Sequence, residues 1–322
     1  MRYVKFRKKN IFFKLAYNFL RSYERMKAVK IINNISKKYN NEVIFIDYPG
    51  SSSKYINKIK AKKKIYWGHS VISDKRVLKL KRINRRLSKY TNIVTICNGM
   101  KEEYEKFFPK LKNKIIKIYN FIDEKEINKK LLEKEKMSEY EKELLEKEYC
   151  VAVGRITNEK DYKTLIEAFI LLKNRGIKEK LYIVGDGELR LELERLIKNK
   201  NLEEEIILLG AKSNPYIWMK NAKIFIHSSF AEGFGLVLIE AMHIGVPIIS
   251  SNFKVSSYEL VEKENNGEIF KIGDSKELSE KIEKLLKNEN LRKEYTERTK
   301  EFVKKFYLEN IIKDYEKIMN ND

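Results

Sequence analysis

The sequence predicts an α/β protein built from two doubly wound parallel sheets, the first of them incomplete. Three observations support this prediction. After residue 150, short apolar runs alternate with longer helix-like segments, a pattern typical of a parallel sheet. Before residue 124 the same alternation gives only about four strands. Between these parts, residues 124–149 contain no Gly or Pro and are mostly charged residues and Leu, which indicates a helical linker.

The length of 322 residues is sufficient for two compact domains. We expect a basic first domain at 1–123, the linker at 124–149, a second domain at 150–300 and a C-terminal helix at 301–322. The charge is unevenly distributed: residues 1–120 hold 32 Lys and Arg against 7 Asp and Glu, and the remainder holds 36 against 39. A basic half-molecule favours an anionic partner, either a membrane surface, a nucleic acid or a phosphorylated substrate, although it could also be a merely soluble basic face.

Composition argues against several classes of protein. Cys97 and Cys150 both lie in apolar strand-like runs, so we expect buried thiols of a reducing compartment and no disulfide framework. The three histidines show no metal-ligand spacing. No apolar stretch reaches 18 residues, so we expect no transmembrane helix and no cleavable signal, and a cytoplasmic location.

In the first domain, residues 1–40 are basic and helical in pattern, with apolar side chains such as Phe12 and Phe19 among the cations. Such a helix can lie on an anionic bilayer or pack on its own domain. Strands are expected at 42–46, 64–67, 92–97 and 114–120, and helices at 75–90 and 101–108. His69 follows the second strand, at the carboxyl end where ligands of open α/β sheets bind, so it is either a functional or a structural histidine.

In the second domain, glycines follow several strands. Gly154-Arg155 ends the first strand and Lys160 follows, a pair of cations suited to a diphosphate. The turn 185–188 reads Gly-Asp-Gly-Glu, which alone is a weak signal. The expected strands are 150–154, 180–185, 205–210, 222–229 and 246–251, and the expected helices are 161–174, 188–199, 214–220, 236–243 and two or three after 275.

The stretch 231–245, AEGFGLVLIEAMHIG, follows a strand and opens a helix. Gly233 and Gly235 let the backbone approach a ligand closely, and the free amides of the first helical turn favour an anion. Glu232 falls in the turn and Glu240 about two turns into the helix. Taken alone, the two glutamates could also be solvated side chains of an ordinary strand–loop–helix unit.

EGFGLVLIEAMHIGVPIISS resembles the signature of retaining nucleotide-sugar glycosyltransferases of the GT-B fold, glycosyltransferase family 4, also called group 1. VGRITNEKDYKTLIEAF resembles the GR-x4-K clamp of this family, and NIVTICNGMKEEYEKFFP…KIIKIYNFID resembles the last part of its N-terminal domain. The resemblance implies a GT-B-like fold, with two Rossmann-like doubly wound parallel-sheet domains and the active site between them. It also implies that the C-terminal helix crosses back to the first domain.

The resemblance implies roles for the matching residues. Arg155 and Lys160 hold the donor diphosphate, and Glu240 binds the ribose hydroxyls. Glu232 and His69 are the catalytic candidates, with Glu232 near the anomeric centre of the transferred sugar. The remaining donor-binding positions are Gly154, Gly210, Phe234, Gly235, Leu236 and Val237.

The expected chemistry needs no cofactor and no metal ion, since no Asp-x-Asp occurs. The co-substrate is a nucleotide diphosphate sugar, with a UDP-sugar expected first. As the nucleoside diphosphate leaves, it gains negative charge, which Arg155, Lys160 and a helix N-terminus stabilise.

The chain departs from the family pattern at three places. Asn98-Gly99 stands where the family usually has Ser-Glu, and 254–259 lacks the glycine that usually precedes a sugar-contacting glutamate, here Glu259. The opening strand and its Gly-rich loop are not found in 1–123, which suggests a truncated reading frame or a reduced form.

We therefore expect a metal-independent retaining glycosyltransferase that transfers a sugar to a cell-surface glycan or lipid-linked acceptor, at the inner face of the membrane. One alternative is a donor-binding protein that is inactive, and others within the fold are a phosphorylase or an epimerase. A basic nucleic-acid-binding protein would require base-stacking aromatics among the cations, and 75–90 offers only Tyr90, so no nucleic-acid partner is expected.

Overall fold

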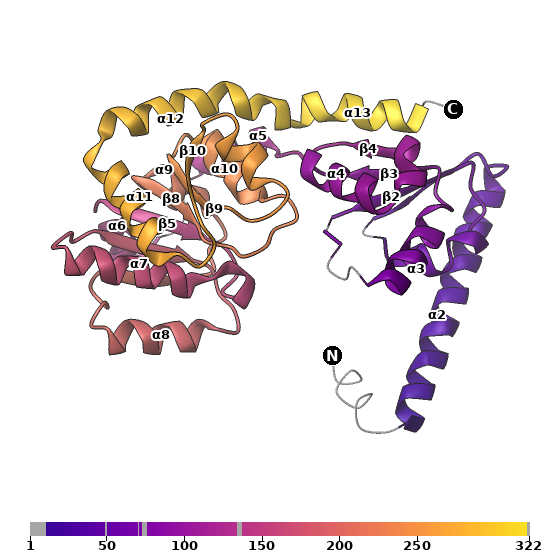
Figure 1. Cartoon of the computed structure of the whole chain (residues 1–322), viewed down its shortest axis with the longest axis horizontal. Helices are drawn as coiled ribbons and strands as arrows, with labels where there is room; N and C mark the ends of the chain where they lie inside the picture. The colour runs from indigo at the N-terminus through magenta and orange to yellow at the C-terminus, as the bar shows by residue number, and fades with distance from the viewer. Residues whose placement is uncertain (1–10, 49, 70, 73–75, 134–136, 321–322) are drawn as a thin grey trace. The chain divides into compact units, whose positions relative to one another are not determined.

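A computed structural model describes residues 11–48, 50–69, 71–72, 76–133 and 137–320, and the side chains from residue 16 onward. The predicted segments 1–40, 75–90 and 124–149 each extend into residues outside this range. The chain divides into two compact units, one made of residues 1–95 and 101–117 and the other of 96–100 and 118–322 (Figure 1). Each unit is described by itself.

Within the described residues, the first unit contains a sheet of four parallel strands in the order β1-β2-β3-β4. The central strands are apolar and β-branched, and Ile65, Trp67, Ile93 and Val94 are fully buried. The strands are β1 (Ile44–Asp47), β2 (Lys63–Gly68), β3 (Asn92–Thr95) and β4 (Ile115–Lys117), and the helices are α2 (Ile11–Lys38), α3 (Val77–Leu87) and α4 (Asn98–Phe107), whose first residues belong to the second unit.

The described part of the second unit contains a six-stranded parallel sheet in the order β10-β9-β8-β5-β6-β7. The order runs outward in one direction through β6 and β7 and in the other through β8, β9 and β10, so the topology reverses between β5 and β8. The strands are β5 (Tyr149–Val153), β6 (Lys180–Val184), β7 (Ile206–Gly210), β8 (Ile224–His227), β9 (Ile248–Ser251) and β10 (Gly267–Phe270).

Helices cover both faces of this sheet. Alternate side chains of β5 and β6, such as Cys150 and Leu181, pack with α7 and α11 in one hydrophobic core. On the opposite face, Tyr149 stacks on Tyr182 and both rings contact Trp218 of α9. The helices are α5 (Glu124–Leu132), α6 (Glu139–Leu145), α7 (Tyr162–Asn174), α8 (Arg190–Asn199), α9 (Tyr216–Lys220), α10 (Leu236–Ile244), α11 (Ser275–Lys287), α12 (Glu289–Phe302) and α13 (Leu308–Asn320).

The predicted α/β class with two parallel sheets is confirmed, and the reversal expected of a doubly wound sheet occurs in the second sheet. One strand was not predicted, because β10 does not stand out as an apolar run in the sequence. The segment expected as a linker contains α5 and α6, which begin with N-caps from Asp123 and Ser138 and bury Ile127 and Leu144. Both helices belong to the second unit.

Candidate functional site

The topological reversal between β5 and β8 determines where a ligand can bind in the second unit. In open α/β sheets the crevice lies beyond the carboxyl ends of the strands at such a reversal. Gly154 directly follows β5, and His227 is the last residue of β8. The loops that leave these two strands carry most of the donor-binding residues predicted from the sequence.

Glycines permit close backbone contacts at the base of this site. The amide of Gly154 donates to the carbonyl of Val184 at 3.0 Å, and the amide of Gly185 donates to the carbonyl of Gly210 at 2.9 Å. A Cβ built on Gly185 would lie 1.9 Å from the carbonyl oxygen of Gly154, and one on Gly187 would lie 2.3 Å from that of Ile156. The Gly-Asp-Gly-Glu turn therefore has a structural function, since it allows the loop after β6 to lie against the loop after β5.

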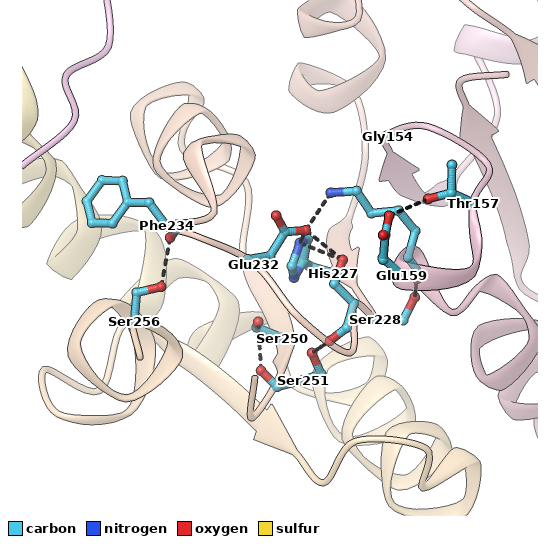
Figure 2. Close-up of polar contacts among 12 residues, drawn as sticks. Gly154, Thr157, Glu159, His227, Ser228, Glu232, Phe234, Ser250, Ser251 and Ser256 are labelled. Atoms are coloured by element: carbon cyan, nitrogen blue, oxygen red, sulfur yellow. Dashed lines mark hydrogen bonds and ion pairs between the residues drawn. The ribbon is translucent and has the colours of Figure 1, made fainter. Parts of the chain in front are cut away.

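Glu232 lies at the centre of a polar cluster between these loops (Figure 2). One of its oxygens, Oε1, pairs with the ammonium of Lys160 and lies 3.1 Å from Nε2 of His227 and 2.8 Å from the hydroxyl of Ser229. The side chains of Lys160 and Glu232 are 19% and 18% exposed, so the pair is largely shielded and still reachable from solvent. The structure thus brings two predicted site residues, 72 positions apart in the sequence, into direct contact.

The cluster sets the ionisation of its members. Burial alone would raise the pKa of Glu232, but its hydrogen bond with His227 and the ammonium of Lys160 outweigh burial and lower the pKa. Burial lowers the pKa of His227, against the opposing effect of the Glu232 carboxylate. At neutral pH the cluster therefore contains an ionised glutamate and a neutral imidazole.

Arg155 differs from Lys160 in its surroundings. Its side chain is exposed and forms no ion pair with any residue that the structure describes. An unpaired guanidinium beside the β5 loop remains available for an anion, whereas Lys160 would have to leave Glu232 or share it.

The N-terminus of α10 has no side-chain cap. Gly235 precedes the helix with φ of +82°, a left-handed conformation that favours glycine, and no side chain caps the first turn. Phe234 is buried, its carbonyl held by the hydroxyl of Ser256 at 2.9 Å, while Leu236 is 39% exposed. The amides of Leu236 and Val237 lie in this uncapped first turn, where helix amides favour negative charge.

Glu240 of α10 has different partners from Glu232. It is hydrogen-bonded to Tyr216 of α9, and the charge of Lys130 of α5 acts on it. Burial raises the pKa of the Glu240 carboxyl, and the hydrogen bond from Tyr216 and the charge of Lys130 only partly oppose this rise. A ligand that donates hydrogen bonds to Glu240 would relieve part of its desolvation.

Glu259, which keeps the position of the glutamate in the family pattern although the preceding glycine is missing, is bound by protein groups at both carboxylate oxygens. Its Oε2 accepts from the backbone amide of Asn98 at 2.9 Å, and its Oε1 accepts from the side-chain amide of Asn98 at 2.6 Å and from the hydroxyl of Tyr119. Two of the three places where the sequence departs from the family pattern therefore lie in contact. A Cβ built on Gly99 would lie 2.3 Å from the carbonyl oxygen of Val255, which itself has φ of +86°.

His69 belongs to the first unit, directly after β2. Its ring lies edge-on to Tyr48 with centroids 4.1 Å apart, and burial lowers its pKa. Its Nε2 is buried and has no hydrogen-bond partner among the described residues. This nitrogen is a polar group that a ligand or water could satisfy.

Sequence reasoning missed His227, Ser229 and Tyr216. The signal for His227 was present, because it ends a strand of a parallel sheet just as His69 follows one. Ser229 and Tyr216 carried no such signal, since their roles depend on contacts with Glu232 and Glu240 that only the fold creates.

A family comparison decides the assignment. The family model described as "Glycosyl transferases group 1" matches residues 133–302, more than half of the chain. The chain belongs to this family. The family predicted from the sequence is thereby confirmed, and the match covers the loops that hold Arg155, Lys160, Glu232 and Glu240.

Curated relatives agree with this group 1 glycosyltransferase assignment. The chain is 32% identical over 197 residues to the Campylobacter jejuni N-acetylgalactosamine-N,N'-diacetylbacillosaminyl-diphospho-undecaprenol 4-alpha-N-acetylgalactosaminyltransferase, covering 61% of this chain and 51% of the relative. It is 32% identical over 207 residues to the Bacillus anthracis N-acetyl-alpha-D-glucosaminyl L-malate synthase, covering 62% and 52%. The chain thus spans about half the length of these relatives.

Solved structures support the GT-B-like fold. A glycosyltransferase from Rickettsia africae superposes with a TM-score of 0.74 at 20% identity, covering 98% of this chain and 83% of that one. Anabaena Alr3699/HepE, crystallised in complex with UDP, superposes with a TM-score of 0.68 at 19% identity, covering 80% and 72%. At these identities the likeness supports the fold alone.

Two further properties concern metals and membranes. Among the residues that the structure describes, no three His, Cys, Asp or Glu side chains are grouped so that they could hold a metal ion. No helix in the described ranges is long and apolar enough to cross a membrane.

Proposed function

We propose that the protein is a retaining, metal-independent glycosyltransferase that binds a nucleotide diphosphate sugar in its second unit. The observation that carries the proposal is the Lys160–Glu232 pair at the topological reversal, formed by the two loops that also carry the exposed Arg155 and lead to the uncapped N-terminus of α10. Cations and free amides suit a diphosphate, and a carboxylate beside them suits the hydroxyls of a sugar.

In the proposed reaction the bond between the anomeric carbon and the diphosphate oxygen breaks, and the acceptor oxygen bonds to the same face of the sugar. The electron pair of the broken bond goes to the diphosphate, whose charge Arg155, Lys160 and the α10 amides stabilise. Glu232 accepts a hydrogen bond from the transferred sugar, and Glu240 accepts hydrogen bonds from the ribose hydroxyls. The proton of the acceptor hydroxyl leaves with the departing diphosphate.

Relatives support the proposed substrates. We propose a UDP-sugar as the first donor to test, since the Anabaena protein of the same fold was crystallised with UDP, and the name of the Campylobacter jejuni relative includes a diphospho-undecaprenol acceptor. We propose a glycan on a lipid diphosphate or at the cell surface as acceptor, because residues 1–120 carry 32 Lys and Arg against 7 Asp and Glu.

The first unit also offers a surface suited to an anionic bilayer. On α2, Phe19 is 73% exposed, Tyr23 56% and Met26 54%, and on α3 Leu78 is 79% exposed. The sequences of both helices also contain lysines and arginines. Apolar groups that insert and cations that meet lipid phosphates are the two components of peripheral membrane binding.

Calorimetric titration tests the donor site. We expect saturable binding of UDP and of one or more UDP-sugars with EDTA present, weakened at least tenfold in Arg155→Ala and Glu240→Ala. Matched controls are Arg195→Ala and Glu280→Ala, which remove exposed side chains of the same types from the same unit. Absence of binding by the unaltered chain to UDP, GDP and a panel of sugar nucleotides would overturn the proposal.

Hydrolysis of the bound UDP-sugar separates an enzyme from a donor-binding protein without activity. Proton NMR of the released sugar tests the stereochemistry, because retention gives the α-anomer first from an α-linked donor. Release of the β-anomer first would contradict the retaining mechanism.

Flotation with vesicles tests the membrane surface. We expect binding to phosphatidylglycerol vesicles, little binding to phosphatidylcholine, and a marked loss in a Phe19→Ser/Tyr23→Ser double variant. Leu191→Ser on α8, which removes a side chain that is 67% exposed in the second unit, is the matched control. Equal binding of all variants would contradict this assignment.

A further inference from the structure

The two oxygens of Glu232 have unequal surroundings. Oε1 contacts all three donors of the cluster, from Lys160, His227 and Ser229, and Figure 2 shows dashed lines that meet at the carboxylate of Glu232. Oε2 forms no hydrogen bond with a residue in the described ranges. One oxygen is thus bound to the protein, and the other remains available for a ligand.

The protonation state of His227 follows from its partner. Glu232 is ionised at neutral pH and can only accept hydrogen bonds, so Nε2 of His227 must carry the proton that points to it. In the neutral imidazole this leaves Nδ1 as an acceptor, and Nδ1 is buried without a partner in the part of the chain that the structure describes. A leucine would fill this place at the end of β8 without an unpaired nitrogen, so the imidazole is disadvantageous for packing alone.

Ser229 acts from a fixed backbone. Its side chain is fully buried, and its carbonyl accepts from the hydroxyl of Ser251 of β9 at 2.6 Å. The adjacent Ser228 donates to the carbonyl of Lys160 at 2.7 Å, which joins the β8 loop to the β5 loop. The ring of His227 lies edge-on to Phe253, with centroids 5.3 Å apart. Both donors to Glu232 are therefore held by neighbouring strands and loops.

Lys160 cannot fix Glu232 in the same way. In the free protein its ammonium pairs with Glu232, and in the proposed donor complex it also faces a diphosphate. The diphosphate attracts the ammonium more strongly than one carboxylate does, because it carries more negative charge. His227 and Ser229 are neutral donors to which the diphosphate offers no comparable attraction.

We propose that His227 and Ser229 are positioning residues that hold Oε1 of Glu232 while Lys160 turns to the diphosphate, so that Oε2 faces the transferred sugar. This inference rests on the proposed function. It predicts that the two residues act on the recognition of the sugar and leave the recognition of the nucleotide unchanged, because Glu232 contacts the sugar alone.

The test compares the affinities for UDP and for a UDP-sugar. Calorimetry with UDP, UDP-glucose, UDP-N-acetylglucosamine and UDP-N-acetylgalactosamine gives the ratio of the UDP-sugar affinity to the UDP affinity. In His227→Leu we expect this ratio to fall at least tenfold while the UDP affinity stays unchanged within twofold, and in Ser229→Ala we expect a smaller fall. His227→Gln, which retains an N–H donor, should restore most of the ratio. Thermal unfolding of each variant checks that it folds.

The outcomes are distinguishable. Failure of the unaltered chain to bind any of these nucleotides overturns the proposed function and this inference with it. Normal UDP-sugar binding and normal turnover by His227→Leu and Ser229→Ala overturn this inference alone. If His227→Leu does not fold, Ser229→Ala and a nitrogen NMR spectrum of the unaltered chain decide, since a proton on Nδ1 in place of Nε2 also overturns it.

Discussion

Glu240 is a residue whose proposed function lowers the stability of the folded protein. Its carboxyl is buried on α10, and burial raises its pKa, so the ionised form at pH 7 destabilises the folded state relative to the unfolded chain. Tyr216 and Lys130 compensate only in part. Such a site is reasonable if a ligand supplies the missing donors, as the proposed ribose hydroxyls would.

Removal of this charge should stabilise the free protein. Glu240→Gln retains an acceptor for Tyr216 and eliminates the desolvated charge, so we expect the free energy of unfolding in urea at pH 7 to rise by about 1 kcal/mol. The affinity for UDP should fall at the same time, because an amide accepts two hydroxyl donors less well than a carboxylate. A variant that is less stable than the original chain would contradict this account of Glu240.

At the scale of elements, the β5 and β6 loops depend on their glycines. A methyl group at Gly185 would lie 1.9 Å from the carbonyl oxygen of Gly154, and backbone cannot retreat as a flexible side chain can. We expect Gly185→Ala to lower the free energy of unfolding by about 3 kcal/mol or more. Gly176→Ala is the matched control, since Gly176 has φ of +79° and nothing within 4 Å of the built Cβ, and it should cost only about 1 kcal/mol.

Urea titration of the two alanine variants gives both values. Equal losses would mean that the backbone conformation, and not the close approach of the two loops, is what requires glycine at 185. Loss of UDP binding in a folded Gly185→Ala chain would further connect this contact to the donor site.

The sequence predicted most elements of the second unit because apolar strands and amphipathic helices alternate clearly there. It missed β10 because Glu268 interrupts the apolar pattern. The Glu268 side chain is 6% exposed, and its charge is compensated by Lys281 and Lys284 of α11 and by the hydroxyl of Tyr295 of α12 at 2.8 Å. These partners become adjacent only in the fold, so a strand with a buried charge cannot be recognised from its own residues.

The candidate site was predictable to a similar degree. Lys160 and Glu232 could be selected because they match the motifs of the family that the sequence resembles, and they meet in the structure. The positions of Arg155, Glu240 and the α10 amides agree with the proposed roles, which remain predictions. His227 and Ser229 could not be assigned, since their effect depends on which oxygen of Glu232 they contact.

For the whole molecule, the three histidines make stability depend on pH. Burial lowers the pKa of His69, His227 and His243, so each binds its proton more readily in the unfolded chain. The free energy of unfolding is therefore expected to be at its full value above about pH 6.5 and to fall as the pH drops below it. The slope is at most about 1.4 kcal/mol per pH unit for each histidine.

Urea unfolding between pH 5.5 and 8 checks this expectation. His227→Gln should show a shallower fall below pH 6.5 than the original chain, because one of the three imidazoles no longer takes up a proton on unfolding. A stability that is constant or rises toward pH 5.5 would contradict it.

The contact between Gly99 and Val255 has a consequence for exchanging parts between relatives. The backbone at Val255 occupies the space that a side chain at 99 would need, and Asn98 binds Glu259 a few residues further on. A loop transplanted from a relative into 252–258 would therefore meet an unsuitable counterpart unless residues 98 and 99 were transplanted with it. We therefore expect that the two segments, more than 150 positions apart in the chain, have to be exchanged together.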